Sequence, residues 1–307
     1  MKPTLLILAG GMASRYGSMK QIDGFGPNEE TIIDYSIYDA IKAGFGKVVF
    51  IIKEEFVDNF KAIFEAKLNG KIATDYVFQN FDLRQYGIDL EIERSKPWGT
   101  GHAILAARHA IKEPFCVINA DDFYGLDAYE QMVKFLTHEV TPAHYAMIGY
   151  EISKTLSDHG AVSRGICTVS DDGYLEDIIE RTKVLPRGDL IVYQEDEQEY
   201  PLPVDTLVSM NFWGFTPEAF IVAEELFREF VKENKENLTA EFYIPTVAEA
   251  LLNSGKVDFK VIPTQSQWFG VTYKEDKPIA QSSIDQLIKD GRYSENLWNQ
   301  CLKIRSY

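Results

Sequence analysis

Short apolar runs alternate with amphipathic segments through the first 140 residues, and this alternation is the strongest constraint on the fold. Three runs have the length and composition of fully buried strands: residues 4–9, 47–52 and 115–120. Four segments are typical of amphipathic helices: residues 31–43, 54–65, 100–111 and 127–136. Because strands that alternate with helices pair in parallel through right-handed crossovers, we expect an α/β fold with a mostly parallel sheet flanked by helices.

The second half of the chain changes to a β-rich pattern. Residues 143–180 are strand-like, and the turn signal Asp171-Asp172-Gly173 within them predicts a hairpin. Residues 184–204 are polar and carry an acidic tract, so we expect a solvated loop there. The remaining expected elements are a strand in 205–215, a helix from Pro217, a helix near 241–253 and a strand in 256–263. This pattern predicts a small β-rich subdomain attached to the α/β core.

The charge balance limits the possible partners. The chain has 47 acidic and 31 basic side chains and a formal net charge of -16, which argues against broad binding to nucleic acid or to an anionic membrane. No stretch approaches the roughly 18 apolar residues that cross a bilayer, and the N-terminal apolar run is too short for an export signal. Three widely spaced cysteines are typical of reduced thiols: Cys116, Cys167 and Cys301. We therefore expect a cytoplasmic protein whose anionic ligands need a local positive site.

Such a positive site follows the first strand, in the segment LAGGMASRYGSMKQ of residues 8–21. Its spacing, GGxxxRxGxxKQ, is neither the GxxxxGK[ST] of a P-loop nor the GxGxxG of a dinucleotide-binding turn. Adjacent Gly10 and Gly11 remove side chains and leave backbone amides free for phosphates. Arg15 offers a planar fork for phosphate oxygens, and Lys20 offers a compact ammonium group. Because open α/β sheets bind ligands at the carboxyl ends of their strands, the pattern favours a polyphosphate site over a surface turn.

Together with four later segments, this one resembles the sugar-1-phosphate nucleotidyltransferases, or nucleotide-sugar pyrophosphorylases. The first segment is similar to the LAGGxGxRxxP…K loop of that family, with Ala13 and Gly17 as departures. The later segments are KPWGTGHAILAARHAI at 96–111, CVINADDFYG at 116–125, LEDIIERTK at 175–183 and VSMNFWGFTPEAF at 208–220. The resemblance implies a Rossmann-like, GT-A-type sheet in a single domain over residues 1–307. The implied divisions are a nucleotide-binding half (1–140), a sugar-phosphate-binding half (141–275) and a C-terminal helical tail (276–307).

The same resemblance implies a reaction between two small molecules. An oxygen of a sugar 1-phosphate would attack the α-phosphorus of a nucleoside triphosphate, with UTP or dTTP favoured, and pyrophosphate would leave. The attacking phosphate has a second pKa of about 6 and is largely dianionic at neutral pH, so positioning and charge stabilisation matter more than a protein nucleophile. The implied catalytic residues are Arg15, Lys20 and Asp121. The implied nucleotide-binding residues are Leu8, Ala9, Gly10, Gly11, Gly99, Thr100 and Gly101. The implied sugar-phosphate-binding residues are Glu180, Arg181 and Asn211, with Lys183 as an alternative to Arg181.

Asp121 is the candidate metal ligand. It directly follows the apolar strand over residues 115–120, so its carboxylate should emerge at the ligand edge of the sheet. Mg²⁺ is a hard cation that prefers such oxygen ligands. Asp122 could share the role, although adjacent strand residues point to opposite faces. The family commonly has a second metal aspartate late in the core, whereas this chain has Gly270 at that place, with Asp276 as the nearest aspartate.

Two other interpretations stay open at this point. A GT-A-type glycosyltransferase would use the paired aspartates for the metal of a nucleotide sugar, but it leaves Arg15 and Lys20 without a role. A non-catalytic nucleotide-sugar-binding homologue would account for Gly270. His102 is expected to pack or to cap a helix rather than to catalyse. The tryptophans expected in the core or in pocket walls are Trp98, Trp213 and Trp268.

Overall fold

The computed structural model describes residues 1–10, 24–94, 96–157, 160–270 and 276–299. The first half of the chain supplies parallel strands β1 (Thr4–Leu8), β2 (Lys47–Ile52), β3 (Ala73–Phe78) and β4 (Phe115–Asn119). Its α-helices are α2 (Ile32–Ala43), α3 (Val57–Leu68), α4 (Thr100–Ala106) and α5 (Leu126–His138). The register pairs Leu8 with both Ile51 and Asn119, so these strands end together at one edge of the sheet. The predicted parallel α/β core is confirmed.

Helix α2 illustrates how the local sequence sets an element. Thr31 precedes the helix, and its hydroxyl accepts a hydrogen bond from the Asp34 amide while the Asp34 carboxylate accepts one from the Thr31 amide. This capping box satisfies backbone donors that the first turn leaves free. At the other end Gly44 takes a φ of 109°, a conformation that favours glycine and stops the helix.

The second half of the chain is mainly antiparallel. Its strands are β6 (His144–Glu151), β7 (Val162–Val169), β8 (Leu175–Arg187), β9 (Leu190–Glu195), β10 (Gln198–Leu202), β11 (Leu207–Phe215) and β12 (Asp258–Pro263). Its helices are α6 (Ala219–Glu233), α7 (Ile244–Asn253) and α8 (Lys277–Lys289). Short 3-10 turns also occur in both halves of the chain: η2 (Glu54–Phe56), η3 (Leu83–Tyr86), η4 (Ala107–His109) and η5 (Ile152–Lys154). Within the described ranges, every helix is too short or too polar to span a lipid bilayer.

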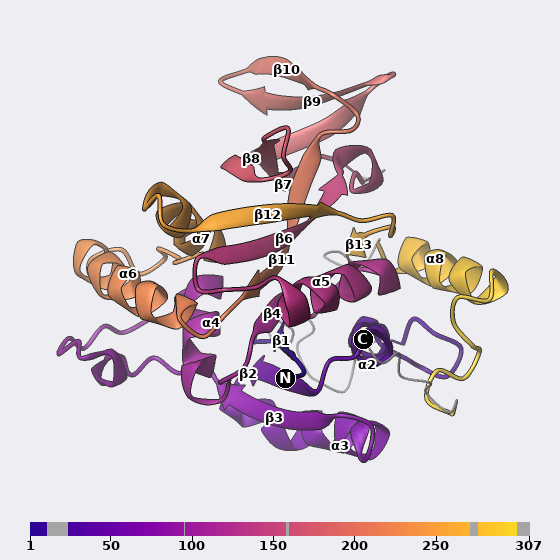
Figure 1. Cartoon of the computed structure of the whole chain (residues 1–307), viewed down its shortest axis with the longest axis horizontal. Helices are drawn as coiled ribbons and strands as arrows, with labels where there is room; N and C mark the ends of the chain where they lie inside the picture. The colour runs from indigo at the N-terminus through magenta and orange to yellow at the C-terminus, as the bar shows by residue number, and fades with distance from the viewer. Residues whose placement is uncertain (11–23, 95, 158–159, 271–275, 300–307) are drawn as a thin grey trace.

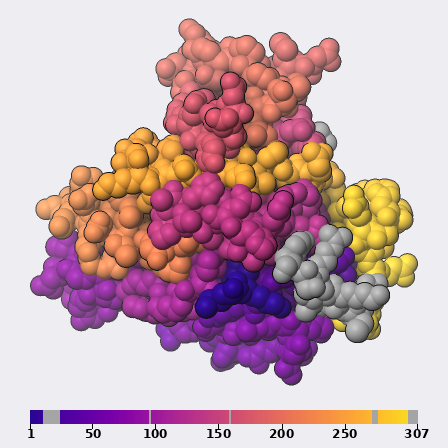
Figure 2. Space-filling model, viewed as in Figure 1, coloured from indigo at the N-terminus to yellow at the C-terminus, as the bar shows by residue number. Residues whose placement is uncertain are grey.

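All these strands join one mixed, eleven-stranded sheet. Its order is β10-β9-β8-β7-β11-β4-β1-β2-β3, with β6 paired to β11 and β12 paired to β6. Figure 1 shows the hairpin of β9 and β10 standing out from one end of the molecule. The same end forms a protrusion above the body in the space-filling view of Figure 2. The outer strands β7 to β10 correspond to the β-rich subdomain expected from the sequence.

The loop predicted over residues 184–204 is wrong. Strand β8 runs to Arg187, and β9 and β10 then form an antiparallel hairpin. Asp196 and Glu197 link the last two strands with φ values of 48° and 63°. Two consecutive positive φ angles give the turn twist that matches a β-hairpin, so polar residues suffice to close it.

The core lies on both faces of the sheet. Leu5 and Ile7 of β1 belong to an apolar cluster with α2, α3 and α5, whereas Leu6 belongs to a second cluster with α4, α6 and α7. This two-sided burial is the reason the strand is an unbroken apolar run. A third cluster packs α8 against α2 and against a two-stranded ribbon of β5 (Asp122–Phe123) and β13 (Phe269–Gly270). The ribbon brings residues 122 and 270 together next to the end of β4.

Candidate active site

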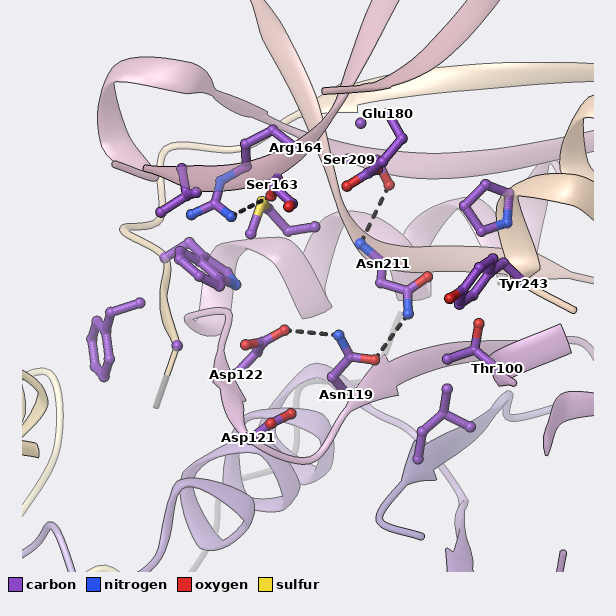
Figure 3. Close-up of a pocket in the computed structure, with 18 of the residues that line it drawn as sticks. Thr100, Asn119, Asp121, Asp122, Ser163, Arg164, Glu180, Ser209, Asn211 and Tyr243 are labelled. Atoms are coloured by element: carbon purple, nitrogen blue, oxygen red, sulfur yellow. Dashed lines mark hydrogen bonds between the residues drawn. The ribbon is translucent and has the colours of Figure 1, made fainter. Parts of the chain in front are cut away.

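A cleft of about 1930 Å³ opens at the edge where the parallel strands end. Figure 3 shows side chains from both halves of the chain gathered around part of it. The first half of the chain contributes Leu8, Gly10, Gln79, Gly99, Thr100, Asn119, Asp121 and Asp122 to the lining. The second half contributes Arg164, Glu180, Ser209, Asn211, Tyr243 and Gly270, among others. The cleft thus brings together groups that lie far apart in the sequence.

Three of the sequence-derived candidates, Gly11, Arg15 and Lys20, lie outside the described residues. Two of the described nucleotide-binding candidates do not line the cleft. Ala9 is buried, and its amide donates to the Ile51 carbonyl at 2.9 Å. The Gly101 amide donates to the Phe242 carbonyl at 2.8 Å. The backbone hydrogen bonds of Ala9 and Gly101 therefore hold the neighbouring lining residues in place, and neither residue reaches the cleft surface itself.

The segment around Gly99 is fixed by the second half of the chain. Gly99 has a φ of 100°, and a Cβ atom there would lie 2.4 Å from the Phe242 carbonyl oxygen. Only glycine fits this close approach. The Thr100 hydroxyl accepts a hydrogen bond of 3.1 Å from the Ile244 amide at the start of α7. Packing against residues 242–244 therefore explains the glycine and holds this wall of the cleft in place.

Gln79, which the sequence analysis did not single out, follows β3 and lines the cleft. Its Nε2 atom donates to the Gly99 carbonyl at 3.1 Å and lies 3.1 Å from His102 Nδ1. The other ring nitrogen of His102 lies 3.0 Å from the Tyr86 hydroxyl. Burial lowers the pKa of His102 to about 3, so the ring is neutral and Nδ1 can accept from the amide. His102 packs in the core, as expected, and it also holds Gln79.

The two aspartates after β4 differ in their surroundings. Asp121 lines the cleft, and Asp122 is 8% exposed. Asp122 Oδ2 accepts hydrogen bonds from Asn119 Nδ2 at 2.9 Å and from the Tyr124 hydroxyl at 3.2 Å. Burial and the charge of Asp121 raise the pKa of Asp122 to about 7. The second aspartate is therefore a built part of the site rather than a solvated turn residue.

Gly270 lies opposite Asp122 in the ribbon of β5 and β13. A Cβ atom at position 270 would lie 2.8 Å from Asp122 Oδ1 and 2.9 Å from the Trp268 ring. A Cβ atom essentially never lies so close to a non-bonded heavy atom, and the Asp122 carboxylate fills the space that a side chain at 270 would need. Glycine at position 270 therefore leaves room for the Asp122 carboxylate, which extends from the facing strand β5 into the space next to Gly270.

Asn119 and Asn211 face each other across the sheet. The side-chain Nδ2 of Asn211 donates to Asn119 Oδ1 at 2.9 Å. The backbone amide of Asn211 donates to the Ser209 hydroxyl at 3.3 Å. The register between β11 and β6 shifts between Ser209 and Trp213, and Asn211 there has a φ of 67°. Asparagine tolerates this left-handed conformation better than most residues, and such outliers gather at functional sites.

Of the candidate sugar-phosphate-binding residues, Glu180 and Asn211 line the cleft and Arg181 does not. Ser209, Gly165 and Glu180 are register partners on β11, β7 and β8, and all three line the cleft. Arg181 instead forms an ion pair with Glu195, and its guanidinium lies 4.3 Å from the centre of the Tyr193 ring. Arg181 is thus held by β9, away from the residues that line the cleft.

Arg164 on β7 is a cation in the cleft wall that the sequence analysis missed. It is 7% exposed, and its Nε atom donates to the Thr155 hydroxyl at 3.0 Å. Its guanidinium lies 4.7 Å from the centre of the Trp268 ring. Burial lowers the pKa of Arg164 to about 10, so it remains charged at neutral pH. Its sequence signal, a single arginine inside a strand pattern, is too common to be informative.

Comparison with known proteins agrees with this geometry. The nucleotidyl transferase family matches residues 4–272. This chain belongs to that family. Comparison with curated protein sequences gives no significant match.

Solved structures of the same fold support the assignment of the architecture. A UDP-glucose pyrophosphorylase complexed with UDP-glucose is 17% identical, with a TM-score of 0.60 over 93% of this chain and 99% of the other. The inositol-1-phosphate CTP transferase from T. maritima is 13% identical, with a TM-score of 0.58 over 93% and 97%. A candidate glucose-1-phosphate thymidylyltransferase from Bacillus anthracis, in complex with a sucrose, is 13% identical, with a TM-score of 0.59 over 91% and 94%. The Rossmann-like α/β architecture expected from the sequence is confirmed.

Proposed function

We propose that this nucleotidyl transferase family member condenses a nucleoside triphosphate with a sugar 1-phosphate and releases pyrophosphate. One observation carries the proposal. A single cleft is lined by Gly10 and Thr100 from the nucleotide half, by Asp121 at its floor, and by Glu180 and Asn211 from the other half. One substrate would bind at the first wall, beside Gly10 and Thr100, and the other at the second wall, beside Glu180 and Asn211. The two substrates would then meet beside the paired aspartates.

The reaction asks for positioning and charge stabilisation. The sugar phosphate attacks the α-phosphorus as a dianion and needs no base at neutral pH, because its second pKa is about 6. Polar groups on the second wall, such as Glu180 and Ser209, suit the hydroxyls of a sugar. Arg15 and Lys20, which lie outside the described residues, are proposed to bind the phosphates, as the family resemblance implies. Arg164 adds a positive charge to the second wall.

A divalent cation fits the chemistry of the residues present. Asp121 and Asp122 offer carboxylate oxygens, and space for the Asp122 carboxylate is left by Gly270. Within the described ranges, no group of three or more metal-binding side chains occurs. We therefore propose Mg²⁺ held by these two carboxylates, with phosphate oxygens and water as its other partners. When bound, the ion would neutralise charge on the phosphates.

The surroundings of Gln79 favour UTP or dTTP among the pyrimidine nucleotides. Both hydrogens of Nε2 are directed to Gly99 and His102, which leaves Oε1 as the atom available to a ligand. This oxygen lies 3.5 Å from the position of a Cβ atom on Gly10. Uracil and thymine carry an N3–H donor that such an acceptor can bind, whereas cytosine has an unprotonated N3.

The test is pyrophosphate release in the presence of Mg²⁺, with UTP, dTTP, CTP, GTP and ATP each mixed with a panel of sugar 1-phosphates. We expect turnover with at least one pair, and a loss of about 100-fold or more in Asp121→Ala. Asp89→Ala is the matched control, because Asp89 is exposed outside the cleft. Release of a free nucleoside diphosphate from a nucleotide sugar would indicate a glycosyltransferase instead. Ligand binding without turnover for any pair would indicate a non-catalytic homologue.

A further inference from the structure

The amide of Asn119 connects the two sides of the cleft and can take only one orientation. Its Nδ2 donates to Asp122 Oδ2, and its Oδ1 accepts from Asn211 Nδ2, each at 2.9 Å (Figure 3). Asp122 Oδ2 also accepts from the Tyr124 hydroxyl at 3.2 Å, so this oxygen acts as an acceptor and selects the donor end of the Asn119 amide. A flipped amide would place oxygen against oxygen at Asp122 and nitrogen against nitrogen at Asn211.

The orientation of Asn119 in turn sets that of Asn211. Since Asn211 must turn its Nδ2 toward Asn119, its carbonyl oxygen is left for the ligand. Figure 3 shows this oxygen on the side of the cleft where Thr100 and Tyr243 lie. A ligand group at this position must therefore be a hydrogen-bond donor, such as a hydroxyl. The φ of 67° at Asn211 directs the side chain out of the regular strand pattern.

We propose that Asn119 is a positioning residue that fixes both the Asp122 carboxylate and the Asn211 amide. Asn119 thereby links the Asp121 and Asp122 carboxylates to Asn211, whose carbonyl oxygen would bind a hydroxyl group of the sugar phosphate. The inference rests on the proposed function for its substrates, but the hydrogen-bond chain itself does not depend on turnover. A chain of three polar side chains with a single consistent polarity orients each member more strictly than an isolated bond would.

The first test uses Mn²⁺ alone as a probe of the carboxylates, with free Mn²⁺ measured by electron paramagnetic resonance. Asn119→Leu removes both hydrogen bonds at similar volume, and we expect it to bind Mn²⁺ about 10-fold more weakly than the wild type. Asn234→Leu is the matched control, because the Asn234 side chain donates to the Phe230 carbonyl at the end of α6 and lies outside the cleft. It should bind Mn²⁺ as the wild type does.

The second test is a swap that keeps the chain of hydrogen bonds but moves the charge. In the double variant Asn119→Asp/Asp122→Asn, the new amide at 122 can donate to the carboxylate at 119, which still accepts from Asn211. We expect Asn119→Leu to raise the KM for the sugar phosphate about 10-fold. The swap should restore that KM to within about threefold of the wild type while Mn²⁺ binding stays weak. A merely structural role for Asn119 would not separate these two readouts.

The outcomes are distinguishable from failure of the proposed function. If no pair of substrates turns over in the wild type, the proposed function fails, and Mn²⁺ binding alone decides on Asn119. Wild-type Mn²⁺ affinity and wild-type KM in Asn119→Leu would overturn the inference. So would a swap whose KM is as high as that of Asn119→Leu while its thermal unfolding matches the wild type. Absence of Mn²⁺ binding by the wild type would also overturn it.

Discussion

The contacts of Gln79 predict a measurable choice among pyrimidine bases. Its Nε2 is held by Gly99 and His102, and the Oε1 that remains can pair with the N3–H of uracil or thymine. With cytosine, two acceptors would face each other and both would lose a partner. Leaving a buried polar group without a partner costs about 1–3 kcal/mol, which corresponds to about 5-fold to 150-fold in kcat/KM. We expect a preference for UTP or dTTP over CTP within this range.

The variant Gln79→Leu removes the hydrogen-bond acceptor but keeps a side chain of similar length. We expect kcat/KM for UTP to fall toward the value for CTP, because the variant can no longer distinguish a donor from an acceptor at N3. The assay is pyrophosphate release with each nucleotide at a fixed sugar 1-phosphate. Gln194→Leu is the matched control, since Gln194 bonds Glu199 in the projecting hairpin. Equal use of CTP by the wild type, or an undiminished preference in Gln79→Leu, would refute the argument.

Three further predictions concern the supporting residues. Gly270→Ala places a methyl group 2.8 Å from Asp122 Oδ1, so we expect weaker Mn²⁺ binding and a stability loss of about 1–3 kcal/mol; unchanged values in titration and thermal unfolding would count against the packing. His102→Phe should weaken the base preference by releasing the Gln79 amide, as measured by the UTP to CTP ratio; a wild-type ratio would show that the ring does not orient the amide. Burial raises the pKa of Asp39 from 3.8 to about 7, so the folded state loses stability, up to about 4 kcal/mol, as the pH rises from about 4 to 7. Asp39→Asn should therefore stabilise the protein more at pH 8 than at pH 5 in denaturant unfolding, and an equal effect at both values would contradict this.

The sequence predicts those elements whose burial leaves a simple pattern. Strands β1 and β4 are buried on both faces, so each appears as an unbroken apolar run. Helix α2 carries both its cap and its terminal glycine in the local sequence. Strand β3 was missed, because ATDYVF mixes polar and apolar residues at the sheet edge. The β9–β10 hairpin was missed as well, since β10 is almost entirely exposed and its sequence shows no buried face.

Site residues follow the same division. Asp121 and Thr100 are read from segments next to a strand or a helix start, and both line the cleft. Asn119, in contrast, gains its role only through partners at positions 122 and 211. The match of Gly270 with the Asp122 carboxylate depends on pairing between segments almost 150 residues apart. Such contacts are tertiary, so no local spacing in the sequence predicts them.

In the proposed reaction the α-phosphorus of the nucleotide is transferred to the acceptor phosphate, and isotope labelling can follow this transfer. The productive nucleoside triphosphate would be labelled at the α-phosphorus in one sample and at the γ-phosphorus in another, and both would be followed through a single turnover. We predict α-label in the nucleotide sugar, γ-label in pyrophosphate, and no label on the denatured protein. Label from the γ-position on the sugar phosphate, or α-label bound to the protein, would rule out direct transfer of the nucleotidyl group.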